Sequence, residues 1–533
     1  QPQTLPSSLV SLTLASYGRP HNQLESLLIP GSLPYSLETL ALEGSIIGRL
    51  KPGLLPSSLT SLKLDDLLSP PTLVDLPSSI TSLEFLNQFN LMLGVGELPP
   101  SLQTLRFGYD YNQPFVPGVF PQSLRSLYFA DGHFNQPFEI NVLPPQLTSL
   151  SLMSRWNQSI IPGSWPNSLA TLQFGKHYTT IELDTLPSSL TVLTYEDKSD
   201  CSFFNSFDFN TKRLILWPST LKTMVVGNMW RYHTDRLPIA IPPSVTSMSI
   251  QLQHQDHLTL LSPSLTHLDL GHIYNSPITP GSLPSSLVNL IIGKSFNQVL
   301  PVGVLPATLA DLSLGDSFNQ ALTTGVLPPS LTSLSLGRDY KQGLKQTSLP
   351  GTLRSLSVDS RGQTKYATLP TSSFKSDLDL LEVRTGFIWT NMVTKNKASP
   401  IKLLRIKQYM KSNTRSQANI IGPMVVSFPN VHTFDVTFYF RPSSTDRIYG
   451  RPPKDSPSDV IYRMQVRRIY QQLAIGLIYS LRNCIDVPKY YMKILDLSRY
   501  DGSRPSPSVK SHSTLPEPVN QTPEDEVNNQ SLI

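Results

Sequence analysis

The sequence predicts a mainly-β protein built as a parallel β-solenoid, and three observations support this fold class. A phrase that begins with Leu-Pro recurs at near-regular intervals along most of the chain. Inside each copy, apolar residues alternate with small polar ones, which is the period of a strand that buries one face. The 533 residues also include 48 prolines but only 28 glycines, and prolines at two fixed places in the repeat explain most of the proline excess.

The phrase opens 17 times, which predicts about 16 to 17 repeats of about 22 residues. The residue before proline is Leu5, Leu33, Leu55, Leu76, Leu98, Phe120, Leu143, Trp165, Leu186, Trp217, Ile241, Ser262, Leu283, Leu305, Leu327, Leu349 and Leu369. The full phrase reads Leu-Pro-x-Ser-Leu-x-x-Leu-x-Leu-Gly, and its last two leucines, such as Leu334 and Leu336, point to one face of a strand. A single short strand cannot bury that face. Stacked copies form a parallel sheet over a continuous core, as in leucine-rich-repeat solenoids.

Two further positions of the repeat have predicted structural roles. Proline lacks an N–H group and therefore suits the position just before a strand, while a second proline before glycine, as in Pro117-Gly118, indicates a turn. An aromatic residue followed by asparagine recurs after the strand, as in Phe296-Asn297. We expect the ring to fill the core on the convex side and the asparagine side chain to satisfy backbone groups at a tight corner.

The complete tetrad Phe134-Asn135-Gln136-Pro137, together with the Leu-Pro-x-Ser-Leu phrase, resembles the FNIP-repeat family. This family consists of relatives of leucine-rich repeats, known mainly from amoebal proteins and some giant viruses. The resemblance covers most of the chain and implies a leucine-rich-repeat-like binding solenoid rather than a known chemistry. Asparagine lies five residues after the last strand leucine (Leu314 to Asn319) instead of three, so we do not expect the coil shape of common leucine-rich repeats in detail.

The predicted repeat solenoid extends over residues 1–374 and includes one irregular region. The insert at residues 196–204 replaces the aromatic-Asn corner, and indicates either decayed repeats or a kink with a protruding loop. The stretch 369–374 is one residue too long for the phrase and is typical of a degenerate terminal coil that caps the array.

The phrase stops after residue 374, and the pattern there predicts a small basic α+β module over residues 375–500. Residues 434–440 alternate as a strand does, and the Pro-, Ser- and Arg-rich segment 441–458 is typical of a loop. A helix is predicted after Ser458 from apolar residues at three- and four-residue steps: Ile461, Met464, Tyr470 or Leu473, Leu477 and Leu481. Residues 501–533 are rich in Ser, Pro and Asn and are predicted to be a disordered tail.

The net charge of +5 is unevenly distributed. Residues 1–374 carry 21 Lys and Arg against 24 Asp and Glu, whereas residues 375–512 carry 22 against 10. The basic residues of this second region include Arg463, Arg467 and Arg468 on the predicted helix, and Lys395, Lys397, Lys402, Arg405, Lys407 and Lys411 upstream. Such a patch is suited to contact a polyanion, namely nucleic acid, acidic lipid or an acidic protein. The alternative is an ordinary solvated face.

The strand residue between the last two core positions faces outward and is the position that the repeat leaves free to vary. A solenoid usually binds its partner through such a face. The most varied stretch of this position, from residue 63 to residue 173, gives the predicted contact residues for a protein partner: Lys63, Glu84, Arg106, Tyr128 and Gln173. Tyrosine and arginine are the expected anchors. The alternative is that all five are ordinary solvated positions.

No motif for catalysis or for a cofactor is present. The sequence has no Gly-rich phosphate loop, no Gly-x-Ser-x-Gly and no His-Glu-x-x-His, so we expect no catalytic, cofactor-binding or metal-binding residues and no small-molecule substrate. Only two cysteines occur, Cys201 and Cys484, and no uninterrupted apolar run is long enough for a membrane span, which favours a cytoplasmic protein. The predicted function is a non-enzymatic scaffold for a protein partner. The alternative is that the basic module binds nucleic acid or an anionic membrane while the repeats target it.

Overall fold

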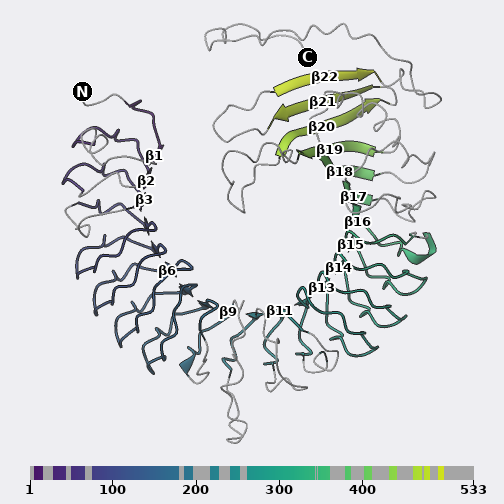
Figure 1. Ribbon diagram of the computed structural model, residues 1–533, viewed down its shortest axis with the longest axis horizontal. Coiled ribbons are helices and arrows are strands. Elements are labelled where there is room, and N and C mark those ends of the chain that lie inside the picture. Colours follow the sequence, from purple (N-terminus) through teal and green to yellow (C-terminus); the bar gives the residue numbers. More distant parts are fainter. Residues whose placement is uncertain are drawn as a thin grey trace, which may run out of the picture.

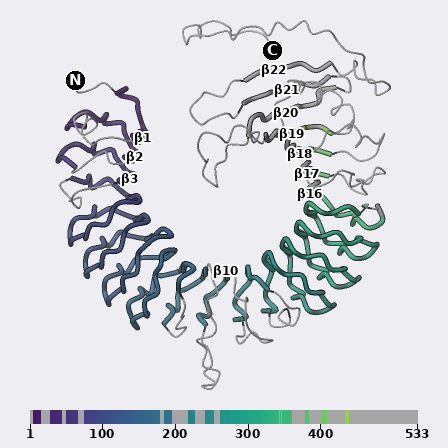
Figure 2. The backbone as a smooth tube through the Cα atoms, viewed as in Figure 1, coloured from purple at the N-terminus to yellow at the C-terminus, as the bar shows by residue number. Residues whose placement is uncertain are grey.

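The computed structural model is a curved solenoid whose coils follow one another along an arc, so that the molecule has the shape of an open ring (Figure 1). The strands lie on the inner, concave side, and the rest of each coil extends outward (Figure 2). The structure describes residues 5–15, 28–43, 50–65, 75–178, 185–195, 217–226, 241–252, 258, 261–342, 344, 346–360, 378–385, 401–410, 431–440, 460–470, 473–480 and 490–496. It consists of strands with almost no helix, so the predicted mainly-β solenoid is confirmed.

One strand follows each of the 17 phrase openings. These strands are β1 (Ser11–Ala15), β2 (Thr39–Glu43), β3 (Ser61–Leu64), β4 (Ser82–Phe85), β5 (Thr104–Phe107), β6 (Ser126–Phe129), β7 (Ser149–Leu152), β8 (Thr171–Phe174), β9 (Val192–Tyr195), β10 (Thr223–Val226), β11 (Ser247–Ile250), β12 (His267–Asp269), β13 (Asn289–Ile292), β14 (Asp311–Leu314), β15 (Ser333–Leu336), β16 (Ser355–Ser360) and β17 (Leu378–Thr385). A short 3-10 helix, η3 (Gln346–Ser348), precedes β16. Five more strands follow: β18 (Ile401–Met410), β19 (Val431–Phe440), β20 (Val460–Tyr470), β21 (Leu473–Ser480) and β22 (Tyr490–Asp496).

The parallel ladder keeps equivalent repeat positions in register from coil to coil. Leu290 of β13 pairs with Leu312 of β14, which pairs with Leu334 of β15. This register is strongly specified, because a slip by one residue would turn every buried leucine to the solvent face. The leucines are at most 2% exposed and belong to one core cluster that extends along the solenoid.

The recurring positions of the phrase make the turns that return each coil to the sheet. The carbonyl of the phrase proline accepts the N–H of the residue three positions later, as from Leu309 to Pro306 at 3.1 Å. The phrase serine then donates its hydroxyl to the previous coil, as from Ser330 Oγ to the Leu309 carbonyl at 2.7 Å. In the Pro-Gly turn, Gly118 has a φ of 86°, a left-handed conformation that side-chain-bearing residues rarely adopt.

The aromatic-Asn pair has the roles that the sequence predicts. Phe296 and Phe318 are fully buried and stack with ring centroids 6.0 Å apart and an interplanar angle of 2°. The side chain of Asn297 accepts the backbone N–H of Asn319 through Oδ1 at 2.9 Å. This bond recurs from coil to coil, and we call the resulting row of carboxamides the asparagine ladder (Asn90, Asn112, Asn135, Asn275, Asn297 and Asn319).

The sheet continues beyond residue 374, the predicted end of the array. Strands β16, β17, β18 and β19 pair in parallel, each with the next, and the strand predicted at 434–440 is confirmed as part of β19. The chain then changes to antiparallel pairing, from β19 to β20, β21 and β22. The division into separate domains at residue 375 stays a prediction.

The helix predicted after Ser458 is wrong, because strands β20 and β21 occupy this segment. Apolar residues are dense enough between residues 460 and 481 to fit both a helical and an extended period. The β-branched residues Val460, Ile461, Val466 and Ile469 favour a strand, and pairing with β19 supplies the backbone partners. The insert 196–204, the terminal stretch 369–374, the loop 441–458 and the tail 501–533 lie outside the described residues.

Candidate interaction surface

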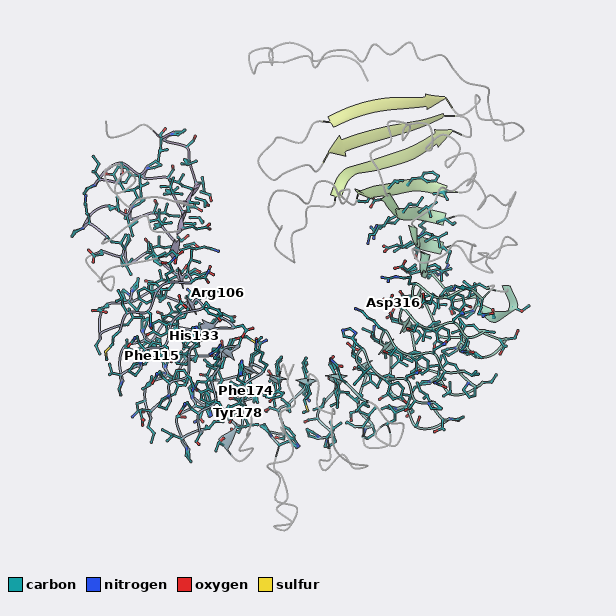
Figure 3. All side chains as sticks on the ribbon, in the orientation of Figure 1. Arg106, Phe115, His133, Phe174, Tyr178 and Asp316 are labelled. Atoms are coloured by element: carbon teal, nitrogen blue, oxygen red, sulfur yellow. The ribbon has the colours of Figure 1, made fainter. Side chains whose placement is uncertain are left out.

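The predicted contact residues lie in one continuous row across neighbouring strands of the concave face. Alternation along each strand buries the two leucine-type positions and turns the residue between them to the inner side of the arc. The parallel register then aligns these residues from β3 to β8, with Lys63 opposite Glu84, Glu84 opposite Arg106, and Arg106 opposite Tyr128. We call this set the concave row, and it consists of Lys63, Glu84, Arg106, Tyr128, Ser151 and Gln173. Figure 3 labels Arg106 toward the inner side of the arc and Phe115 farther out.

The side chains of the concave row contact one another in pairs. Lys63 Nζ lies 2.9 Å from Glu84 Oε2, and the two side chains are 43% and 28% exposed. The Arg106 guanidinium carbon lies 4.4 Å from the centroid of the Tyr128 ring. Exposed contacts of these kinds contribute only up to about 1 kcal/mol each. They therefore orient the side chains without withdrawing them from a partner.

Ser151 was not among the predicted contact residues, although it fills the one position missing between Tyr128 and Gln173. It is only 5% exposed, and its hydroxyl donates to Gln173 Oε1 at 3.0 Å. The strand register places Ser151 in the row, but a serine is a common residue at this position of the repeat, so the sequence did not mark it as a contact residue. The structure therefore shows Gln173 as a side chain positioned by its neighbour.

A second part of the concave face has the same backbone and different side chains. From β13 to β16 the equivalent positions are Ile291, Ser313, Ser335 and Ser357. Ile291 is 40% exposed and has no polar group to offer. Of these two parts of the concave face, the β3 to β8 part carries the large, charged and aromatic side chains.

The family model of the FNIP repeat matches residues 21–66, 71–110, 111–154, 156–195, 257–295, 274–317, 296–338 and 318–359. The matched segments include strands β2 to β9 and β12 to β15 in full, most of β16, and the whole concave row. The protein belongs to the FNIP-repeat family. The resemblance seen in the sequence is thereby confirmed.

Among solved structures, the FNIP-repeat protein is similar to CroV588, a giant-virus protein described as a novel circular LRR protein structure. The two are 31% identical with a TM-score of 0.55, and the match covers 78% of this chain and 58% of CroV588. This chain therefore spans less than two thirds of that relative's length. The Drosophila Toll–Spätzle complex, in its glycosylated form, matches at 13% identity and a TM-score of 0.47, covering 88% of this chain and 74% of that one. The mouse RP105/MD-1 complex matches at 14% identity and a TM-score of 0.45, and the match covers 79% of this chain and 90% of that one. No curated protein matches the chain.

Beyond the last FNIP match, the concave position continues into a group of ion pairs that we call the C-terminal ion cluster (Glu382, Arg405, Lys407 and Asp435). Glu382 is opposite Arg405, and Arg405 is opposite Asp435, on strands β17, β18 and β19. Arg405 Nε lies 3.2 Å from Asp435 Oδ2, and Lys407 Nζ lies 3.1 Å from Glu382 Oε1. The carboxylate side chains are only 9% and 5% exposed. Buried carboxylates require such partners, so this cluster has a structural role.

The basic residues predicted to form a polyanion patch are arranged differently from the prediction. Arg463, Arg467 and Arg468 lie along strand β20 rather than on a helix, so helical spacing no longer groups them. Upstream, Lys402 forms an ion pair with Asp379 at 2.6 Å, and its hydrogen bond lowers the pKa of that carboxyl. Arg405 and Lys407 belong to the C-terminal ion cluster, and Lys395, Lys397 and Lys411 lie outside the described residues. Polyanion binding stays a prediction.

The described part of the chain offers no metal site. Within it, no three His, Cys, Asp or Glu side chains are placed so that they can hold a metal ion together. The same part of the chain contains no helix that is long and apolar enough to cross a membrane.

Proposed function

We propose that the protein is a non-enzymatic scaffold that binds a protein partner on the concave face of the coils β3 to β8. Lys63, Glu84, Arg106, Tyr128 and Gln173 make the contacts, with Arg106 and Tyr128 as anchors. The observation that carries the proposal is the stacked Arg106–Tyr128 pair within the register-aligned row. Arginine and tyrosine dominate the binding free energy of many protein interfaces, and a pre-oriented pair loses less side-chain entropy on binding.

The FNIP membership supports this proposal, because repeat solenoids generally present an extended surface to protein partners. The Lys63–Glu84 pair adds one charge of each sign next to the anchors. A partner that carries complementary charges and an aromatic or aliphatic contact for Tyr128 fits this arrangement.

The test is affinity purification with the full chain, from a lysate of the cells that produce it, using wild type and the double variant Arg106→Ala/Tyr128→Ala. Loss of two anchors is expected to reduce recovery of a specific partner at least about tenfold. The matched control, Ser313→Ala/Ser335→Ala, changes the same repeat position elsewhere on the concave face and is expected to keep the partner. Equal recovery with both double variants would show that the concave row is not the interface. Circular dichroism of each variant checks that the fold is retained.

A further inference from the structure

A groove lies at the carboxyl-terminal ends of strands β4 to β7, away from the concave row. Two parallel lines of side chains form it. The charged wall consists of Gln88, Asp110, His133 and Arg155, and the amide wall consists of Asn90, Asn112 and Asn135. Each wall receives one side chain per coil, so with strands roughly 4.8 Å apart the groove crosses the solenoid over about 14 Å. Figure 3 labels His133 in this part of the arc. We call this feature the rim groove.

The amide wall presents hydrogen-bond donors, because the asparagine ladder uses the acceptors. Asn112 Oδ1 accepts the backbone N–H of Asn135 at 2.9 Å and the Nε2 group of Gln136 at 3.1 Å. Asn90 and Asn135 make the same two bonds to the following coil. These bonds fix which end of each carboxamide is oxygen. The Nδ2 groups of Asn90, Asn112 and Asn135 have no acceptor among the described residues, so they remain for a ligand.

The charged wall supplies acceptors from Asp110 and Gln88 and donors from Gln88, His133 and Arg155, and the fixed charges of Asp110 and Arg155 cancel. Asp110 Oδ1 lies 4.0 Å from His133 Nε2, and both side chains are more than 40% exposed. The Arg155 guanidinium forms no ion pair with any described residue and lines the groove two coils away from Asp110. The lining residues include no aliphatic side chain and no Phe, Tyr or Trp. The groove is therefore polar, close to neutral and richer in donors than in acceptors.

This chemistry selects among classes of ligand. The Asp110 carboxylate repels a polyanion that lies along the groove. The groove also has no apolar pocket that could bind the side chains of a peptide. A hydroxyl group has two acceptor lone pairs and one donor, so a chain of hydroxyls can accept from the asparagine amides and from Arg155 while donating to Asp110. We propose that the rim groove binds a neutral, linear oligosaccharide that lies across the coils β4 to β7.

The experiment is isothermal titration of the full chain with four neutral hexasaccharides (cellohexaose, maltohexaose, laminarihexaose and chitohexaose) and with a heparin hexasaccharide as the anionic probe. At least one neutral hexasaccharide is expected to bind saturably, with an affinity that does not change between low and high salt. Binding confined to the heparin probe and weakened by salt would overturn the proposal in favour of a polyanion site. Failure of all four neutral probes to saturate would also overturn it.

Variants locate the binding in the groove. Asp110→Asn and Arg155→Gln keep the backbone and the asparagine ladder, and each is expected to weaken the neutral hexasaccharide about tenfold or more, since hydrogen bonds to charged groups are the strong ones. Asp339→Asn is the matched control, because Asp339 precedes Tyr340 as Asp110 precedes Tyr111 and lies outside the groove. Undiminished binding in both groove variants would contradict the proposal. Arg106→Ala/Tyr128→Ala is expected to keep sugar binding, which separates this test from that of the concave row.

Discussion

The coils β4 to β8 (the first block) and the coils β13 to β16 (the second block) share one structural frame, namely the strand register, the buried core and the asparagine ladder. They differ at the positions that the repeat leaves free to vary. The coils β4 to β8 and β13 to β15 each carry one buried aromatic ring after the strand, with centroids 5.9 Å apart for Phe89 and Tyr111 and 6.0 Å apart for Phe296 and Phe318. Both also carry the asparagine ladder with the same 2.9 Å bond. On the concave face, however, the first block presents Arg106 and Tyr128 where the second presents serines. Shared contacts thus identify what the fold requires, and differing ones identify what is available for binding.

The two blocks also differ inside the core. The last buried strand position is aromatic in β4, β5, β6 and β8 of the first block, with Leu152 of β7 as the exception, and aliphatic in the second block, as with Phe129 and Leu314. Phe129 stacks on Phe134 with centroids 3.9 Å apart, which gives its coil a second ring. This double aromatic layer makes the first block bulkier at the same backbone spacing.

The largest expected effect is the loss of this layer. Phe129→Ala is expected to destabilise the first block by about 3 to 5 kcal/mol, because it leaves a cavity beside Phe134 and Phe115. Leu314→Ala in the second block is expected to cost about 2 to 4 kcal/mol. Since a repeat array can unfold in parts, native-state hydrogen exchange of the strand amides is the measurement. Equal protection losses in both blocks after Phe129→Ala would contradict a local aromatic layer.

The asparagine ladder is expected to respond equally in the two blocks. Asn112→Ala and Asn297→Ala each leave a backbone N–H without its acceptor, at a cost of about 1 to 2 kcal/mol. The exchange rates of the amides of Asn135 and Asn319, respectively, are expected to rise by about tenfold or more. Gln136→Ala is the control for Asn112→Ala, because it removes the side-chain donor to Asn112 Oδ1 and keeps the backbone bond from Asn135. A large effect in one block and none in the other would show that the frame is not shared.

The sequence predicted the frame well because the frame is repetitive. A leucine at the same position in many copies, such as Leu290, Leu312 and Leu334, averages out local exceptions and specifies both strand and register. The concave row followed from that register, with Ser151 as the omission. In contrast, strands β20 and β21 occur once, and a dense apolar segment without a repeat does not distinguish a helix from a strand.

Contacts between side chains of different coils could not be predicted from the sequence. The Arg106–Tyr128 stack and the rim groove depend on distances across the sheet that a single sequence does not contain. The C-terminal ion cluster was missed for a related reason. Arg405 and Lys407 appeared as free charge because their partner Glu382 lies on the preceding strand, β17, and only the pairing of β17 with β18 brings them together.

A smaller effect is expected at Tyr111, the only tyrosine in the run of stacked rings Phe89, Tyr111 and Phe134. Its hydroxyl is buried without a hydrogen-bond partner among the described residues, and burial raises the pKa of Tyr111 above its usual range. Tyr111→Phe is therefore expected to stabilise the first block by about 1 kcal/mol. The converse variant, Phe296→Tyr, places a hydroxyl at the equivalent position of the second block and is expected to destabilise it. Urea unfolding measures both, and a destabilising Tyr111→Phe would indicate that the hydroxyl has a partner.

Alkaline pH is expected to destabilise both blocks, because each contains a buried tyrosine with a raised pKa. Burial raises the pKa of Tyr340 to about 12, whereas an unfolded tyrosine titrates near 10. The unfolded chain therefore loses its proton first, so stability is complete below pH 10 and falls as the pH rises from about 10 to 12. Tyr340→Phe is expected to remove part of this loss in the second block, and Tyr111→Phe part of it in the first. Unchanged alkaline unfolding in the double variant would mean that the tyrosines do not determine it.

The smallest expected effect distinguishes the blocks at acid pH. Burial, followed by the nearby charges of Lys176 and Arg155, lowers the pKa of His177, while Asp131 opposes the shift. The unfolded chain then binds the proton more readily, so stability is complete above about pH 6.5 and decreases as the pH falls toward the folded-state pKa. Because the imidazole is partly exposed, the change is expected to stay below about 0.5 kcal/mol. Urea unfolding at pH 7.5 and 5.5, followed by tryptophan fluorescence, measures it, since Trp156 packs on Tyr178 beside His177. His177→Gln is expected to reduce the difference in unfolding free energy between pH 7.5 and pH 5.5. Ser317→Gln, at the equivalent position of the second block, is the control and is expected to leave that difference unchanged. The reverse result would assign the acid sensitivity to another group.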